Sequence, residues 1–111
     1  MPGRAADPTW ESAIRTPPFP GYVSGHACFA GAAQAVLEAE FGSDTIPAVS
    51  LSTPSAPGVT RRYTRLQDIV DEISNARIWG GIHWRTDQTA GETLGRQVGQ
   101  WVVSRELRPA Q

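Results

Sequence analysis

The chain has 111 residues, of which 40% are hydrophobic and 19% charged, a composition typical of one small globular domain. Its formal net charge of −1 does not favour broad binding to nucleic acid or an anionic membrane, and no apolar run approaches the ~18 residues that span a bilayer. All ten basic residues are arginine and Cys28 is the one cysteine, so this chain contains neither a catalytic lysine nor an internal disulfide.

Residues 1–23 are predicted to form an extended segment without regular structure. Five prolines remove backbone hydrogen-bond donors from this stretch, and the run from Thr16 to Gly21 favours a stiff path. Such a segment cannot bury a core of its own. We therefore expect it to lie across a helical core in residues 24–105, so that residues 1–111 form a single domain.

The first predicted helix runs from Ser24 to Phe41. Ser24 is a favourable N-cap, the run that follows is rich in alanine and free of proline, and Gly42 is a natural C-terminal stop. The larger apolar residues share one helical face, the pattern of a helix that packs on a core. They are Phe29, Ala33, Val36, Leu37 and Phe41.

Residues 42–63 are rich in proline, glycine, serine and threonine and are predicted to form turns. Short extended pieces near residues 49–52 and 59–63 could make a loose hairpin, but the pattern does not predict a sheet. A second helix then opens at Thr64 or Arg65. Its apolar stripe consists of Leu66, Ile69, Val70 and Ile73.

The third predicted helix runs from about Trp84 or Thr86 to about Arg105, after a link that holds two adjacent glycines. Its apolar stripe consists of Ala90, Leu94, Val98, Trp101 and Val102. Beside the stripe, glycines recur every four residues, at Gly91, Gly95 and Gly99. This spacing predicts close packing against another helix. The sequence thus predicts an all-α fold of about three helices with long ordered loops.

The first motif with chemical potential is Ser24-Gly25-His26, at the predicted start of the first helix. A helix N-terminus presents unpaired backbone N–H groups and the positive end of the helix dipole to an anion. Gly25 lets an oxyanion approach without a side chain in its way, and the Ser24 hydroxyl can add a donor. His26 would be placed to give or take a proton.

The second motif is Arg77-x5-His83-x3-Asp87, which crosses the glycine link and enters the third helix. Arg77 offers a planar pair of donors that matches the oxygens of phosphate or vanadate. His83 and Asp87 are four positions apart and share a helical face. The carboxylate can therefore fix the imidazole tautomer and leave the other ring nitrogen free to attack phosphorus or ligate a metal.

The two motifs and their flanking residues resemble the superfamily of vanadium-dependent haloperoxidases and type 2 phosphatidic acid phosphatases. Ser24-Gly25-His26 is similar to the Pro-Ser-Gly-His motif of that superfamily, and Arg77-x5-His83-x3-Asp87 has the spacing of its Ser-Arg-x5-His-x3-Asp motif. The likeness covers about residues 6–104 and is greater to the bacterial haloperoxidase-like branch.

The resemblance implies the C-terminal half of a helical bundle that holds vanadate, or phosphate in the same site. In that family the counterpart of His83 binds vanadium or is phosphorylated, the counterpart of Asp87 orients it, and the counterpart of His26 is the acid–base group. The oxyanion is held by the counterparts of Ser24, Gly25 and Arg77. The implied activity is oxidation of a halide by hydrogen peroxide, and the alternative is hydrolysis of a phosphate ester through a phosphohistidine. Family members often work outside the cytoplasm.

The chain departs from the family pattern at three points. Val23 replaces a proline, Ala76 replaces the serine before Arg77, and the upstream Lys-x6-Arg-Pro motif cannot be present because there is no lysine. Each missing cation would make charge-assisted bonds of roughly 1.5–3 kcal/mol to the anion. We therefore expect a fragment or truncated homologue, with little or no activity alone, that self-associates or pairs with an N-terminal half to cover exposed apolar faces.

Other readings of the same residues are weaker. A zinc site built from His26, Cys28, His83 and Asp87 is disfavoured, because positions two apart on a helix point in nearly opposite directions. A Ser24–His26–Asp87 hydrolase triad fails for the same reason. Cys28 is more typical of a small packed residue than of a reactive thiol. A non-enzymatic helical protein that retains the motifs only by descent stays open.

Overall fold

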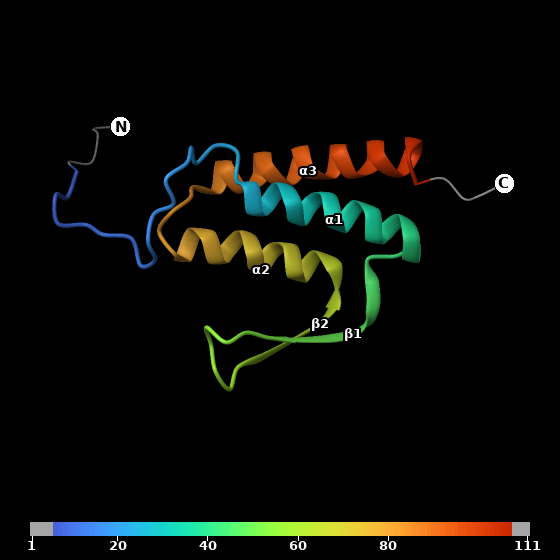
Figure 1. The fold of residues 1–111 in the computed structure, drawn as a ribbon, viewed down its shortest axis with the longest axis horizontal. Helices are drawn as coiled ribbons and strands as arrows, with labels where there is room; N and C mark the ends of the chain where they lie inside the picture. The colour runs from blue at the N-terminus through green and yellow to red at the C-terminus, as the bar shows by residue number, and fades with distance from the viewer. Residues whose placement is uncertain (1–5, 108–111) are drawn as a thin grey trace.

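The computed structural model describes residues 6–107, and Figure 1 shows three helices with a hairpin beside them. The elements in chain order are α1 (Gly25–Phe41), β1 (Thr45–Ser52), β2 (Thr60–Arg65), α2 (Leu66–Trp79) and α3 (Arg85–Arg105). Residues 6–23 contain no helix or strand and run past one end of the helices before entering α1 (Figure 1). Residues 1–5 of the predicted extended segment lie outside the described residues.

The boundaries of α1 follow from its two end residues. The Ser24 hydroxyl accepts a hydrogen bond from the backbone N–H of Ala27 at 3.3 Å, which satisfies one of the unpaired donors of the first turn. At the other end Gly42 adopts φ 71°, the left-handed conformation that ends a helix at little steric expense in glycine.

α1 and α3 lie side by side and run in the same direction (Figure 1). Their contact follows the glycine line of α3, where a Cβ at Gly91 would stand 2.6 Å from the carbonyl oxygen of Ser24. A Cβ at Gly95 would overlap the backbone of Cys28, and Gly99 is equally crowded. The predicted close packing of the third helix is confirmed, and the glycine line of α3 meets the backbone of α1 and its small alanine side chains.

α2 runs in the opposite direction and is attached more loosely. Leu66 and Val70 are buried against α1, so the predicted apolar stripe of the second helix is confirmed at these positions. Between α1 and α2 remains a void of about 120 Å³, whose lining includes Ala33 and Ile73. Side-chain hydrogen bonds link α2 to α3: Ser74 donates to Glu92, and Arg85 donates to the side-chain oxygen of Asn75 at 2.8 Å.

The all-α prediction is wrong in one element, because β1 and β2 form a two-stranded antiparallel sheet. The register pairs Val49 with Tyr63 and Ser52 with Thr60. No residue of either strand is buried. A sheet that is wet on both faces imposes no alternation of apolar and polar residues, so the sequence carries no period-two signal for it.

Asp44 ties the hairpin to α2. Its carboxylate accepts hydrogen bonds from the backbone N–H of Gln67 and from Nε of Arg65, each at 2.9 Å. Arg65 precedes α2 without capping it, so the carboxylate of Asp44 takes the place of an N-cap side chain. The Gln67 N–H is the main reason that the pKa of Asp44 lies below its ordinary value of 3.8.

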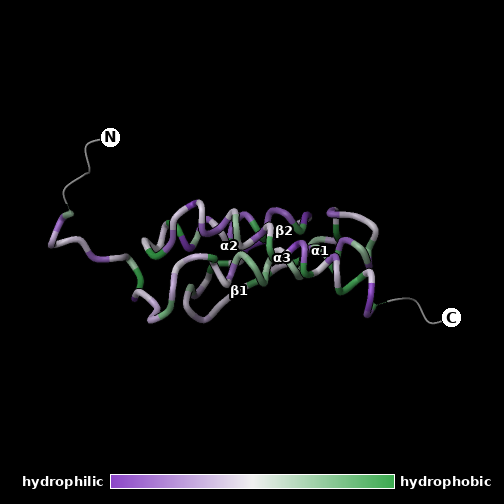
Figure 2. The backbone as a smooth tube through the Cα atoms, turned by 90° about the horizontal axis from the view of Figure 1, so that it is seen from above, coloured by the Kyte–Doolittle hydropathy of each residue, from purple (hydrophilic) through white to green (hydrophobic). Residues whose placement is uncertain are grey.

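The large apolar residues of α1 and α3 point away from the interior that the described residues form. Phe29 is 81% exposed, and Leu94, Val98 and Trp101 are also exposed. The buried positions of α1 are instead small or polar: Ala27, Gly31, Gln34 and Ala35. In Figure 2 the hydrophobic stretches, in green, recur along all three helices rather than gathering at one centre. No helix in the described part is long and apolar enough to cross a membrane.

Candidate oxyanion site

Three separate pieces of the chain meet at one end of the helices. α1 and α3 begin at this end and α2 finishes there (Figure 1). The pieces carry Ser24–His26 at the start of α1, Arg77 in the last turn of α2, and His83 and Asp87 around the start of α3. The backbone N–H of Ser24 donates to the carbonyl oxygen of Asp87 at 3.0 Å, which joins the first and third pieces directly.

His83 and Asp87 form a buried pair. Nδ1 of His83 lies 3.1 Å from Oδ2 of Asp87, and the two side chains are 2% and 10% exposed. The same oxygen accepts the backbone N–H of Trp84 at 2.9 Å, so Asp87 also caps the first turn of α3. That N–H, followed by His83, holds the pKa of Asp87 below its ordinary value of 3.8. With its proton on Nδ1, His83 presents Nε2 as a ligand or nucleophile.

The extended segment before α1 covers this pair. A Cβ at Gly21 would lie 3.5 Å from Oδ2 of Asp87 and 3.9 Å from Nδ1 of His83, at ordinary van der Waals distance. The backbone at Gly21 therefore lies against the imidazole and the carboxylate, where it limits the access of water to their hydrogen bond. The segment therefore packs against this end of the helices at Gly21.

Gly25 leaves open space at the first turn of α1. A Cβ built on Gly25 would meet no atom within 4 Å, although the preceding residue, Ser24, is fully buried. A hollow of about 650 Å³ opens at this point, lined by Phe19, Gly25, His26, Phe29, Ala30 and Ile73. The first turn of a helix has N–H groups without helical partners, so an oxyanion that entered this space would meet hydrogen-bond donors.

Arg77 adds a cation to the same place. Its Nε is buried and has no hydrogen-bond partner among residues 6–107. The pKa of His26 lies below its ordinary value of 6.5, first because the ring is partly desolvated and then because Arg77 and His83 repel its charged form. The three groups are therefore electrostatic neighbours. A covered, unpaired arginine donor beside two imidazoles suits an anion.

These residues fit a tetrahedral oxyanion such as vanadate or phosphate. They provide a nitrogen ligand at His83, a guanidinium at Arg77 and an open helix start at Gly25. The zinc alternative finds no support, because within the part of the chain that the structure describes no three His, Cys, Asp or Glu side chains could hold a metal ion together.

Comparison with known proteins identifies the family of this chain. A family model described as the VCPO second helical-bundle domain matches residues 2–111. The chain belongs to the vanadium haloperoxidase superfamily. Among curated proteins, none matches the chain.

Solved structures of vanadium haloperoxidases share the fold. The first bacterial vanadium-dependent iodoperoxidase is 35% identical in sequence, and its crystal structure matches with a TM-score of 0.75 over 86% of this chain. Holo-type and apo-type bacterial vanadium-dependent chloroperoxidase are 22% and 23% identical, with TM-scores of 0.71 and 0.69 over 91% and 86% of this chain. The match covers 23% of the iodoperoxidase chain and 24% of each chloroperoxidase chain, so this chain spans about a quarter of these haloperoxidases.

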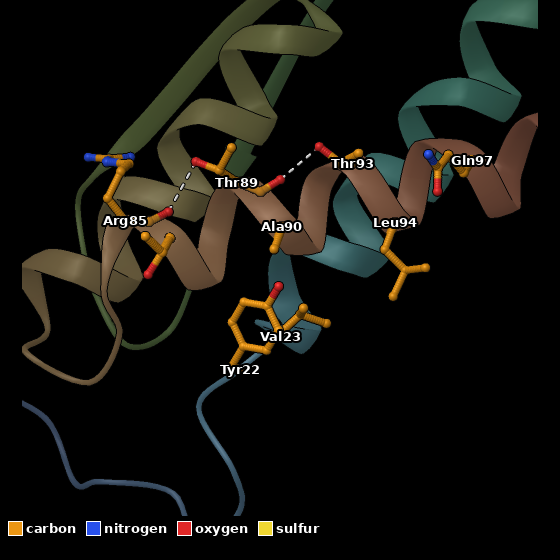
Figure 3. A pocket seen from close by; sticks show the side chains of 9 residues that line it. Tyr22, Val23, Arg85, Thr89, Ala90, Thr93, Leu94 and Gln97 are labelled. Atoms are coloured by element: carbon orange, nitrogen blue, oxygen red, sulfur yellow. Dashed lines mark hydrogen bonds between the residues drawn. The ribbon is translucent and has the colours of Figure 1, made fainter.

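A larger hollow of this haloperoxidase-like chain lies on the outer face of α3. It measures about 810 Å³, and Figure 3 shows Val23, Ala90 and Leu94 on one side of the helix with Tyr22 beside them. Arg85 stands apart from this apolar group (Figure 3). Neither histidine belongs to its lining, so the larger hollow is separate from the candidate oxyanion site.

The sequence motifs did not point to Gln88, which follows Asp87 in the first turn of α3. Gln88 is 1% exposed, and neither end of its carboxamide has a hydrogen-bond partner among the described residues. A signal for its burial exists in the sequence, because Gln88 lies three and seven positions before Gly91 and Gly95 and so shares their helical face.

Proposed function

We propose that this chain forms the histidine and arginine part of a vanadium-dependent haloperoxidase site. In this proposal His83 ligates vanadate, while Arg77 and the first turn of α1 at Gly25 hold its oxygens. The observation that carries it is the meeting of two imidazoles with a buried, unpaired arginine donor at one end of the helices. The 35% identity to a vanadium-dependent iodoperoxidase supports vanadate as the anion.

Each side chain of the site has a defined task in the proposed reaction. Asp87 keeps the proton of His83 on Nδ1, so that the lone pair of Nε2 is available to vanadium. His26 has a lowered pKa and is neutral at pH 7, so it can accept a proton from hydrogen peroxide. Bound vanadate supplies Lewis-acid activation of hydrogen peroxide toward a halide.

The chain by itself should bind the anion weakly. It contains no lysine, and the one arginine in the two motifs is Arg77. Two further cations would each add charge-assisted bonds of roughly 1.5–3 kcal/mol, so their absence weakens binding by orders of magnitude. Halide oxidation by this chain alone is expected to be slight for the same reason.

A vanadate titration followed by vanadium NMR tests the proposal. We expect saturable binding that is lost in His83→Ala and weakened in Arg77→Met. Arg62→Met is the matched control, because Arg62 is an exposed arginine of β2 and its loss should leave binding unchanged. Absence of saturable binding at millimolar vanadate would contradict the proposal and favour a helical relic that keeps the motifs by descent.

Phosphate separates the phosphatase alternative from the haloperoxidase. The same site geometry would allow Nε2 of His83 to attack phosphorus, since phosphate and vanadate share a tetrahedral shape. We expect a phosphate ester to leave no phosphohistidine on His83 when the chain is followed by phosphorus NMR. A stable phosphohistidine that disappears in His83→Ala would favour the acid phosphatase.

A further inference from the structure

Gln88 is the buried polar side chain that the proposed reaction leaves unused. Its carboxamide oxygen, Oε1, can accept hydrogen bonds and its nitrogen, Nε2, can donate them. Both atoms are buried from solvent, and neither has a hydrogen-bond partner among the described residues. Leaving such a group unsatisfied disfavours the folded state, so a buried orphan amide calls for an explanation. The third covered and unpartnered side-chain atom in the described part is Nε of Arg77.

The helix register places Gln88 level with Arg77. Gln88 and Glu92 are four positions apart on α3 and share a face, and Glu92 accepts the hydroxyl of Ser74 on α2. α2 runs opposite to α3 (Figure 1). The residue one turn before Glu92 on α3, which is Gln88, is therefore level with the turn that follows Ser74 on α2. That turn of α2 carries Arg77.

The unpaired atoms are complementary. Nε of Arg77 is a donor without an acceptor, and Oε1 of Gln88 is an acceptor without a donor. Both belong to side chains with several rotatable bonds, on two helices that the bond from Ser74 to Glu92 links. We propose that Gln88 is a positioning residue for Arg77: its Oε1 accepts the Nε–H of Arg77 and so directs the two terminal amino groups of the guanidinium at the bound anion.

This role deepens the proposed function and rests on it, because it assigns the orientation of the same arginine. A neutral amide is suited to the task. A carboxylate behind Arg77 would cancel part of the positive charge that the anion needs, whereas the amide oxygen fixes the guanidinium and leaves its net charge intact.

The test uses Gln88→Leu, which keeps the volume and removes both polar atoms. The Nε–H signal of Arg77 in proton–nitrogen NMR should shift and exchange faster with water, and vanadate should bind about tenfold more weakly. The Tm should fall slightly, because the variant removes the proposed acceptor of the buried Nε–H of Arg77. In an Arg77→Met background, Gln88→Leu should cause no further loss of affinity.

Gln34→Leu is the matched control. Gln34 is also a buried glutamine, but its Nε2 donates to Oε1 of Gln67 at 2.8 Å at the start of α2, away from the site. This variant should lower the Tm and leave the affinity for vanadate unchanged.

An unchanged Arg77 Nε–H signal in Gln88→Leu would overturn the inference, as would a loss of affinity that adds to that of Arg77→Met. The two proposals fail separately. If the wild-type chain binds no vanadate, the proposed function fails, while the Nε–H signal still decides whether Gln88 holds Arg77.

Discussion

His26 reports on the charge of the site through its own titration. Partial desolvation, Arg77 and His83 all disfavour its charged form. We predict that proton NMR of the free chain finds its pKa below 6.5, and that vanadate or phosphate raises it because an anion stabilises the imidazolium. In Arg77→Met the pKa of the free chain should rise, since one repelling charge is gone.

The same shift has a consequence for stability. The folded chain binds a proton at His26 less readily than the unfolded chain, so the free energy of unfolding should decrease as the pH falls through about 6.5 and below. In His26→Gln, the midpoint of urea unfolding should depend less on pH across this range. If His26 titrated with a pKa of 6.5 and neither vanadate nor phosphate changed that pKa, the proposed proximity of His26 to Arg77 and His83 would be contradicted.

Asp87 serves both the helix and the imidazole, so its charge should matter to both. We predict that Asp87→Asn loses about 1 kcal/mol of stability at neutral pH, because the amide oxygen is a poorer cap for Trp84. It should also weaken vanadate binding, since His83 is less firmly held. Urea unfolding and the vanadate titration measure the two effects.

The pH dependence of stability tests whether the charge of Asp87 causes its effect on the fold. A carboxylate with a lowered pKa stabilises the fold above its ordinary value of 3.8, and this contribution is lost as the pH falls through the lower pKa of the folded state. The gap in stability between wild type and Asp87→Asn should therefore shrink in acid. A constant gap would exclude the charge of Asp87 as the cause.

At the scale of the elements, two glycines with opposite surroundings give a paired prediction. Gly95→Ala should destabilise the chain by about 2 kcal/mol, because the methyl group overlaps the backbone of Cys28 and outweighs the gain in helix propensity. Gly25→Ala meets no atom within 4 Å and should fold normally, yet bind vanadate at least about tenfold more weakly because the methyl group enters the anion space. Thermal unfolding and the titration should rank the variants in opposite orders.

The junction between hairpin and α2 gives a further prediction. Asp44→Ala removes the carboxylate that accepts the Gln67 N–H and pairs with Arg65, so the start of α2 should fray and the Tm should fall. Asp71→Ala is the control, because Asp71 is an exposed acid of the same helix that accepts only from the side chain of Gln67. Faster amide exchange at residues 66–69 in Asp44→Ala alone would support the assignment.

Much of this element-level structure could be predicted from the sequence. Ser24 and Gly42 mark the ends of α1, and the glycine line marks the contact of α3, because both signals depend on local backbone requirements. A loose hairpin could be suggested from two short extended pieces, but the sheet could not be predicted, since its strands bury nothing. The prediction that the face of α1 with Phe29 packs on the core was wrong. α1 packs through small residues that permit close approach of the backbones, and its larger side chains stay exposed.

The candidate site divides in the same way. His83 and Asp87 could be paired from their spacing, because four positions on a helix make one face. The second task of Asp87, as a cap, depends on the local geometry at Trp84. Gln88 could not be linked to Arg77, since the relation depends on how two helices are aligned in space.

At the scale of the whole molecule, the exposed apolar faces predict association. Phe29, Leu94, Val98 and Trp101 are exposed on faces of α1 and α3 that no other part of the described residues covers. Sedimentation velocity should therefore find assemblies that grow with concentration, and Leu94→Glu together with Val98→Glu should reduce them. A strictly monomeric chain at all concentrations would show that these faces do not drive pairing.

The unequal attachment of the helices affects which anion the site prefers. α1 and α3 meet backbone to backbone, whereas α2 is separated from α1 by a small void and carries Arg77 at its end. The guanidinium therefore belongs to the helix that is packed less closely against α1. A bulkier side chain at Ala33, which lines this void, should change the distance of Arg77 from His83. It should so retune selectivity between the longer bonds of vanadate and the shorter bonds of phosphate without altering any group that lines the anion space.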